Sequence, residues 1–197
     1  MRLLSLIILL IFASSGFPQS YRVTPEGKVV SDSNCYSFEA PKKWNVAIGN
    51  AAPYFINFSP KKLAPMMDEL PNGGAELGVA SASDARNGVK SIDQWMELRR
   101  RAYAFTSVQE IQFPAETGIS RAVKVSWTNQ KDLESGDQIT AAVTVFFVFQ
   151  GQPFQAEMDF HENDRKKGSY EKTLTTLLES FRPSADSKGG SNGCPKP

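Results

Sequence analysis

The sequence predicts an α+β protein, an α/β/α sandwich in which two amphipathic helices cover a central, largely antiparallel sheet. Short strand-like segments follow one another through short turns, which favours antiparallel pairing. Two segments, 91–105 and 169–181, have the spacing of helices. The run ITAAVTVFFVFQ (139–150) is apolar at nearly every position, which is typical of a strand covered on both faces.

The first half of the sandwich is predicted to contain four strands after a polar N-terminal arm (21–34). The segment CYSFEA alternates and places Tyr36 and Phe38 on one face. The other three strands are expected in PKKWNVAI (41–48), YFINF (54–58) and AELGVASAS (75–83). The last of these follows the turn PNGG, so a hairpin is expected there.

The first helix is predicted to begin with a capping box, in which Ser91 is followed three residues later by Gln94. Its apolar positions are Ile92, Trp95, Met96, Leu98 and Ala102. Three arginines follow one another at 99–101 and fan around one side of the helix. We expect them to form a solvated face, with contact to an acidic partner as the alternative.

The second half is predicted to contain four more strands, at 107–115, 119–127, 139–150 and 154–160, and then a helix at 169–181. In FQAEMDF the apolar side chains point one way, and Gln155, Glu157 and Asp159 point the other. The final helix has one apolar stripe: Tyr170, Leu174, Leu177, Leu178 and Phe181. Residues 184–197 have the Pro, Ser and Gly content of a flexible tail.

Residues 1–20 are predicted to be a secretory signal peptide. Arg2 precedes the uncharged run LLSLIILLIFA, which small residues follow. This run is shorter than the ~20 residues that a membrane-spanning helix needs. The alternative is a single membrane anchor. We therefore expect a secreted or periplasmic protein without a membrane span in its mature chain.

The charge balance excludes a nucleic-acid partner of the usual kind. The chain has 22 basic and 21 acidic side chains, and removal of residues 1–20 takes away one arginine. Nucleic-acid binders carry a basic excess on one face.

The two cysteines, Cys35 and Cys194, lie near opposite ends of the predicted domain. In an exported protein an even cysteine count usually indicates a disulfide, and we expect these two to be bonded. Two free thiols, or a tail cysteine that pairs between molecules, are the alternatives.

The sequence favours no catalytic, metal or cofactor site. The segment DFHEND holds the only histidine, His161, among acidic residues. A zinc site needs three or four matched ligands, and the segment lacks the order of a calcium loop. We therefore interpret it as the polar end of a strand, with His161 on the surface. Paired carboxylates such as Glu69 and Glu76 cannot be judged without distances.

The connection Ser59–Gly74 is the candidate partner-binding segment. It is longer than the ~4–6 residues usual for such connections. It places the adjacent Met66 and Met67 near Lys61 and Lys62, and methionine suits binding surfaces. The alternative is a helical turn whose methionines cap the core.

Several short motifs resemble PsbP-like domains. They are YSFEAPKKW, INFSP, GVASAS, SIDQW and LLESFRP, which fall in that family's order between residues 35 and 183. The resemblance implies the α/β/α sandwich shared with Mog-type factors, without a known active site. It implies an extracytoplasmic, non-catalytic module that binds a protein partner or assists assembly of an envelope complex, and we expect the protein to be a monomer. A small-molecule carrier or a hydrolase with a pocket at the sheet edge is the alternative.

Overall fold

The computed structural model describes residues 21–31, 35–48, 56–60, 75–82, 88–129, 140–161 and 164–184. Its strands are β1 Tyr21–Val23, β2 Lys28–Ser31, β3 Tyr36–Glu39, β4 Trp44–Ile48, β5 Ile56–Pro60, β6 Ala75–Ser81, β7 Tyr103–Ile111, β8 Ile119–Asn129, β9 Thr140–Phe149, β10 Gln152–His161 and β11 Arg182–Pro183. The helices are α2 Ile92–Arg100 and α4 Lys167–Glu179, and a 3₁₀ turn, η1, spans Ala115–Thr117.

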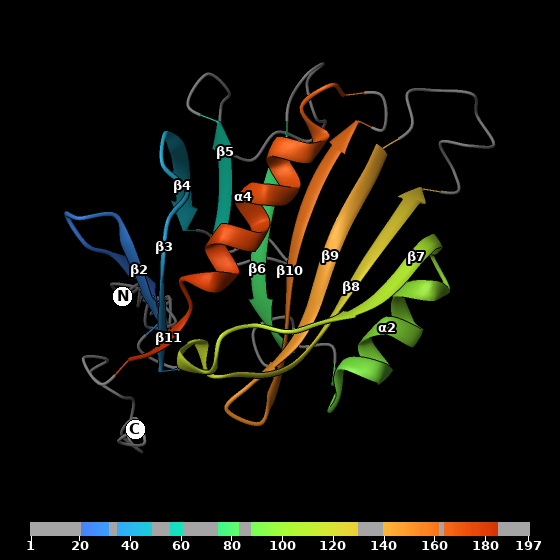
Figure 1. Ribbon diagram of the computed structural model, residues 1–197, viewed down its shortest axis with the longest axis horizontal. Helices are drawn as coiled ribbons and strands as arrows, with labels where there is room; N and C mark the ends of the chain where they lie inside the picture. Colours follow the sequence, from blue (N-terminus) through green and yellow to red (C-terminus); the bar gives the residue numbers. More distant parts are fainter. Residues whose placement is uncertain are drawn as a thin grey trace, which may run out of the picture.

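A seven-stranded antiparallel sheet forms the centre of the molecule, in the order β4-β5-β6-β10-β9-β8-β7 (Figure 1). Neighbouring strands are mostly consecutive in the chain. The exception is the pairing of β6 with β10, which joins the two halves of the sequence. The α+β class with antiparallel strands is confirmed.

The segment predicted as a polar arm contributes two strands of a second, four-stranded sheet, in the order β1-β2-β3-β11. The turn TPEG joins β1 to β2, and Gly27 adopts the left-handed conformation with φ 85°. Val29 and Val30 of β2 are buried. The description of this segment as an arm was therefore wrong, because a strand of four residues is too short to show a clear alternation.

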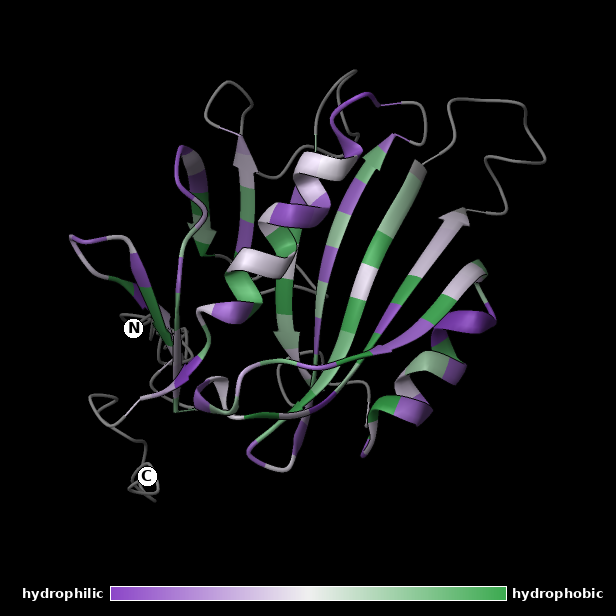
Figure 2. Cartoon of the chain, viewed as in Figure 1, coloured by the Kyte–Doolittle hydropathy of each residue, from purple (hydrophilic) through white to green (hydrophobic). Residues whose placement is uncertain are grey.

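The two helices cover opposite faces of the large sheet. Helix α4 packs against β10 and the side chains of the larger core, whereas α2 packs against β9 and β7. Strand β9 serves both cores: Val143, Val145 and Phe147 face α4, and Ala142 and Phe146 face α2. Figure 2 shows β9 mostly in the green of hydrophobic residues, interrupted by paler bands. The prediction of a central strand covered on both faces is confirmed.

An aromatic cluster ties the small sheet to the large one. The ring of Phe181, just after α4, stacks on Phe38 of β3 with centroids 5.0 Å apart, and on Tyr36 at the same distance. Phe147 and Phe154 meet the same ring edge-on. This cluster leaves the α4 side of the sheet filled with apolar side chains, so polar chemistry belongs to the α2 side. Among the described residues, no helix is long and apolar enough to cross a membrane.

Candidate functional site

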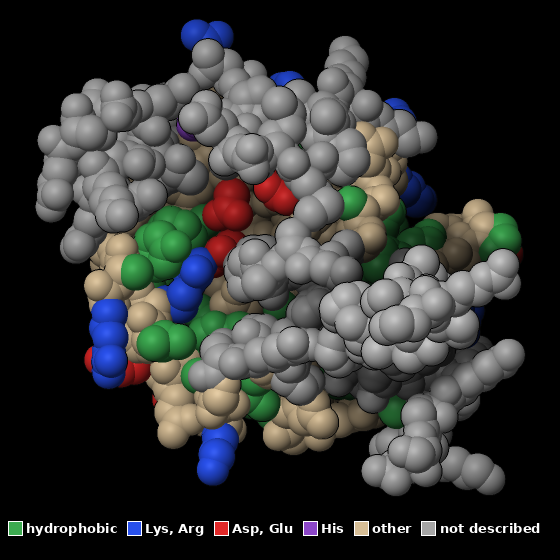
Figure 3. Space-filling view, turned by 180° about the vertical axis from the view of Figure 1, so that it is seen from behind, with side chains coloured by type: hydrophobic (Ala, Val, Ile, Leu, Met, Phe, Trp, Pro, Cys, Tyr) green, Lys and Arg blue, Asp and Glu red, His purple; other side chains and the backbone are tan. Residues whose placement is uncertain are grey.

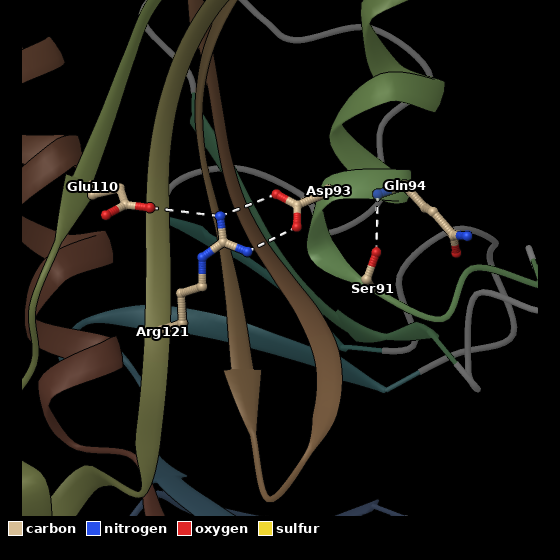
Figure 4. A network of polar contacts seen from close by, with 5 residues as sticks. All are labelled: Ser91, Asp93, Gln94, Glu110 and Arg121. Atoms are coloured by element: carbon tan, nitrogen blue, oxygen red, sulfur yellow. Dashed lines mark hydrogen bonds and ion pairs between the residues drawn. The ribbon is translucent and has the colours of Figure 1, made fainter.

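Helix α2 turns one of its arginines, Arg99, toward the sheet rather than toward solvent. The Ser91 Oγ accepts a hydrogen bond from the Gln94 backbone N–H at 3.2 Å, so Ser91 is the N-cap of the helix (Figure 4). The return bond differs from that of the predicted capping box, because the Gln94 Oε1 accepts from the Lys90 backbone N–H at 2.9 Å, one residue before the N-cap. Trp95 is buried against the sheet. Arg99 follows it by four residues and therefore lies on the same face of the helix.

Arg99 is the centre of a polar network between α2 and the sheet. Its guanidinium forms an ion pair with Glu157 of β10, whose side chain is only 4% exposed. Thr144 of β9 donates a hydrogen bond to the same carboxylate, and the Trp127 indole N–H donates to Thr144 at 2.8 Å. The guanidinium also lies over the Tyr103 ring, 4.4 Å from its centroid. A buried carboxylate is thus held by a cation and a hydroxyl, which is how proteins tolerate a buried charge.

The prediction that all three arginines form a solvated face was wrong for Arg99. Its side chain is 16% exposed, whereas that of Arg100 is 50% exposed. Arg100 lies over the Phe105 ring at 5.3 Å, and Arg101 is exposed. The reason is the 100° rotation per residue, which turns one arginine of the three toward the sheet.

Two further carboxylates lie beside this network on the α2 side. Asp159 follows Glu157 by two residues on β10, and it pairs directly across the sheet with Glu76 of β6. Desolvation raises the pKa of Asp159 well above its usual range, and the like charges of Glu157 and Glu76 raise it further, against an opposing effect of Arg99. Desolvation also raises the pKa of Glu76. Figure 3 shows acidic side chains on this face next to a basic one and beside hydrophobic side chains.

The same face continues onto β5 with two neutral polar side chains. Asn57 pairs with Gly78, which pairs in turn with Glu157. Ser59 occupies the next position on that face of β5. Asn57 is 8% exposed and Ser59 is 6% exposed. Neither Asn57 Oδ1 nor Ser59 Oγ has a hydrogen-bond partner among the described residues.

His161, the last residue of β10, also lies on the α2 side, and it is buried. The prediction of a surface histidine was therefore wrong, because β10 extends one residue beyond the predicted strand. Asp164 begins the connection to α4: its Oδ1 accepts from the backbone N–H of Lys166, the N-cap residue of that helix, at 2.8 Å. Within the described ranges, no group of three or more His, Cys, Asp or Glu side chains has a spacing that could hold a metal ion.

The outer side of α2 borders a groove of about 530 Å³. Gly88, Val89, Asp93, Gln94, Glu97, Leu98 and Arg101 line this α2 groove. Leu98 is 44% exposed, although the sequence predicted it on the apolar stripe of the helix. The groove is open to solvent along its length and has apolar side chains between charged ones.

A charged network beside the groove joins α2 to the sheet. Arg121 of β8 donates to both carboxylate oxygens of Asp93, at 2.8 and 3.0 Å, and pairs with Glu110 of β7 at 3.5 Å (Figure 4). The hydrogen bonds from Arg121 lower the pKa of Asp93. The network is exposed, so it contributes little to stability. The ion pair between Asp93 and Arg121 holds the first turn of α2 over β8.

Most of the sequence-predicted site residues lie outside the described residues: Lys61, Lys62, Met66, Met67, Glu69 and Cys194. Cys35 is described, and its carbonyl accepts a hydrogen bond from the Ser184 backbone N–H at 2.9 Å. This contact brings the start of the tail beside Cys35. The pairing of Cys35 with Cys194 stays a prediction.

Sequence reasoning missed the Arg99 network and the carboxylates around it. A signal for Arg99 was present, because residues 92, 95, 96 and 99 share one helix face. A signal for Glu157 and Asp159 was present too. Both lie on β10, the strand beside β9, and a helix that covers one face of β9 also lies near that face of β10. Glu76 could not be linked to them, because its distance from Asp159 depends on the pairing of β6 with β10.

Comparisons with known proteins add structural likenesses at low identity. The solved structures similar to this chain include LpqN, involved in cell envelope biogenesis of Mycobacterium tuberculosis, with a TM-score of 0.45 at 9% identity, over 85% of this chain and 86% of LpqN. They also include the cyanobacterial PsbP (CyanoP) of Synechocystis sp. PCC 6803, with a TM-score of 0.44 at 11% identity, over 88% of this chain and 98% of CyanoP. A third is the Ran-binding protein Mog1p of Saccharomyces cerevisiae, with a TM-score of 0.44 at 6% identity, over 76% of this chain and 90% of Mog1p.

No protein-family model matches the chain, and no curated protein matches it. TM-scores of this size at such identities do not assign a family. The α+β class is established by the strands and helices themselves, and membership of the PsbP-like family stays a prediction.

Proposed function

We propose that this chain is an exported, non-catalytic binding module that contacts a partner protein through the α2 groove. The observation that carries the proposal is the open groove of about 530 Å³ with Leu98 at its wall, 44% exposed. A partner that covers an exposed leucine beside a groove removes apolar surface from water, and this burial favours binding.

The composition of the groove favours a protein over a small molecule. Pockets for small molecules enclose most of the ligand surface, and this groove is open. Its lining combines the apolar residues Leu98 and Val89 with charged ones, Asp93, Glu97 and Arg101. That is the anatomy of protein–protein interfaces.

Export rests on the sequence. Arg2 and the apolar run after it have the order of a secretory signal peptide, and two cysteines suit an oxidising compartment. The segment Ser59–Gly74, with Met66 and Met67, is a second candidate for partner contact on the same sequence grounds.

The alternative is a small-molecule carrier or a hydrolase. The observation that favours it is the pair of carboxyls, Asp159 and Glu76, whose pKa values are both raised. Carboxyls with raised pKa values cluster at functional sites, where they act as acids or bind ligands.

The proposal is tested by placing a photoreactive side chain at Leu98 in the full chain and irradiating it in the native envelope. We expect a single cross-linked protein, identified by mass spectrometry. The matched control is Val23 of β1, which is similarly apolar and 41% exposed but lies on the small sheet.

Introducing a charge at the same position completes the test. Leu98→Lys should abolish capture of that protein by the purified chain, and Val23→Lys should leave it unchanged. Cross-linking from both positions alike, or capture that survives Leu98→Lys, rules out the groove as the contact surface.

A further inference from the structure

The carboxyl groups on the α2 side of the sheet outnumber the described cations around them. Glu76, Glu157 and Asp159 lie on one face of β6 and β10, and Arg99 is the cation that reaches them. The nearby bases on β8 are engaged elsewhere. Arg121 pairs with Asp93 and Glu110 (Figure 4), and Lys124 pairs with Glu171 on the opposite face at 2.6 Å.

Two buried polar side chains adjoin these carboxylates. Asn57 lies in one row across the sheet with Gly78 and Glu157. Ser59 follows Phe58, whose partner Leu77 follows Glu76, so Ser59 and Glu76 lie beyond the last pair of this register. Directly opposed side chains in such rows are about 5 Å apart at Cβ. Asn57 and Ser59 are 8% and 6% exposed, and Asn57 Oδ1 and Ser59 Oγ have no hydrogen-bond partner within the described chain. Buried polar atoms without partners are uncommon in folded proteins and call for an explanation.

We propose that Glu76, Asp159, Asn57 and Ser59 together bind an organic cation that carries a primary ammonium or guanidinium group.

The geometry of the four side chains suits such a group. Asn57 and Ser59 are buried, whereas Glu76 and Asp159 are only partly buried. An ammonium has three donors and no acceptor, and the four side chains offer two carboxylates, an amide oxygen and a hydroxyl. Gly78 has no side chain, which leaves room in the row between Asn57 and Glu157.

The position of Arg99 explains why a second cation is needed. Its guanidinium is held by Glu157 and stacked over Tyr103, so it compensates Glu157 first. A metal ion fits less well than an organic cation, because the acidic side chains of the described residues are not spaced as a metal-ligand group. The site is separate from the α2 groove and does not depend on it, since the groove lies on the outer side of the helix.

The test measures binding of two amine probes to the full chain by isothermal titration calorimetry. One probe is 1,4-diaminobutane, a free diamine, and the other is a short blocked peptide with one lysine. We expect at least one of them to bind, and the same peptide with norleucine in place of lysine not to bind. Binding of the diamine alone assigns a free amine as ligand, and binding of the peptide alone assigns a lysine side chain of a partner protein.

Variants locate the binding. Glu76→Gln and Asp159→Asn should each weaken the amine about tenfold or more, because each removes a charge-assisted hydrogen bond. The matched control is Glu171→Gln, the same change on the opposite face, which should leave the affinity unchanged. Ser59→Ala should weaken binding by a smaller factor without lowering thermal stability, since the hydroxyl has no described partner to lose.

The affinity should also rise with pH, because a cation binds the ionised form of Asp159. Among the described residues, the titratable and charged groups beside Asp159 on this face are Glu76, Glu157, His161 and Arg99, and Arg121 lies farther off on β8 with Asp93, so Asp159→Asn must remove most of the pH dependence. The proposal is overturned if neither probe binds, if Glu171→Gln weakens binding as much as Glu76→Gln does, or if calcium or magnesium displaces the amine at equal concentration. Affinity that survives both carboxylate changes in folded protein also overturns it.

Discussion

Removal of the Arg99 side-chain charge is the sharpest test of the buried network. Arg99→Met keeps most of the apolar stem of the side chain but leaves Glu157, 4% exposed, without its cation. Breaking a buried ion pair in this way typically costs about 3–5 kcal/mol, because an uncompensated charge stays buried. Thr144 still donates to Glu157, so we expect the lower end, about 3 kcal/mol.

Urea unfolding followed by tryptophan fluorescence measures this cost, since Trp127 lies beside Arg99 with its ring centroid 5.2 Å from the guanidinium carbon. The matched control is Arg101→Met, two residues along the same helix and exposed. It should change the free energy of unfolding by no more than about 0.5 kcal/mol.

The double variant Arg99→Met/Glu157→Gln separates the charge from the packing. It removes both charges, so it should be more stable than Arg99→Met alone by about 1–2 kcal/mol. Equal costs for Arg99→Met and Arg101→Met would show that Arg99 is no more buried than its neighbour. A double variant less stable than the single one would refute the role of the ion pair.

Two further predictions concern pH and the cysteines. Because the folded state raises the pKa of Asp159 above its ordinary value of 3.8, the folded protein holds this proton more tightly than the unfolded chain does. The contribution of Asp159 to stability is therefore present at acid pH and is lost as pH rises from about 3.8 through the raised value. At neutral pH Asp159→Asn should be more stable than the parent, and a urea series across pH that runs parallel for both proteins would contradict this. The disulfide between Cys35 and Cys194 is expected to contribute at most about 5 kcal/mol to stability. Thiol titration of the denatured, unreduced protein should therefore find neither cysteine reactive. Two reactive thiols per chain would show that the disulfide is absent.

The sequence by itself determined the secondary structure of this protein to a large extent. The N-cap at Ser91 sets the start of α2, and the nearly continuous apolar run in β9 predicts a strand covered twice. These signals are local, because they depend on hydrogen bonds and side-chain periods within about ten residues. Length and turn residues then favour antiparallel neighbours, which the large sheet confirms.

The tertiary structure alone decided which polar groups meet. Arg99 and Glu157 are 58 residues apart in the chain, and Glu76 meets Asp159 through the register of β6 on β10. A shift of that register by one residue would turn every one of these side chains to the other face, and no local pattern specifies it. The hairpin β1–β2 depends on the tertiary structure as well, because β2 pairs with β3 and its Val29 packs in the larger core. The acidic face of the α2 side is thus a product of strand pairing and helix placement, because contacts between distant segments depend on the whole fold and not on any one segment.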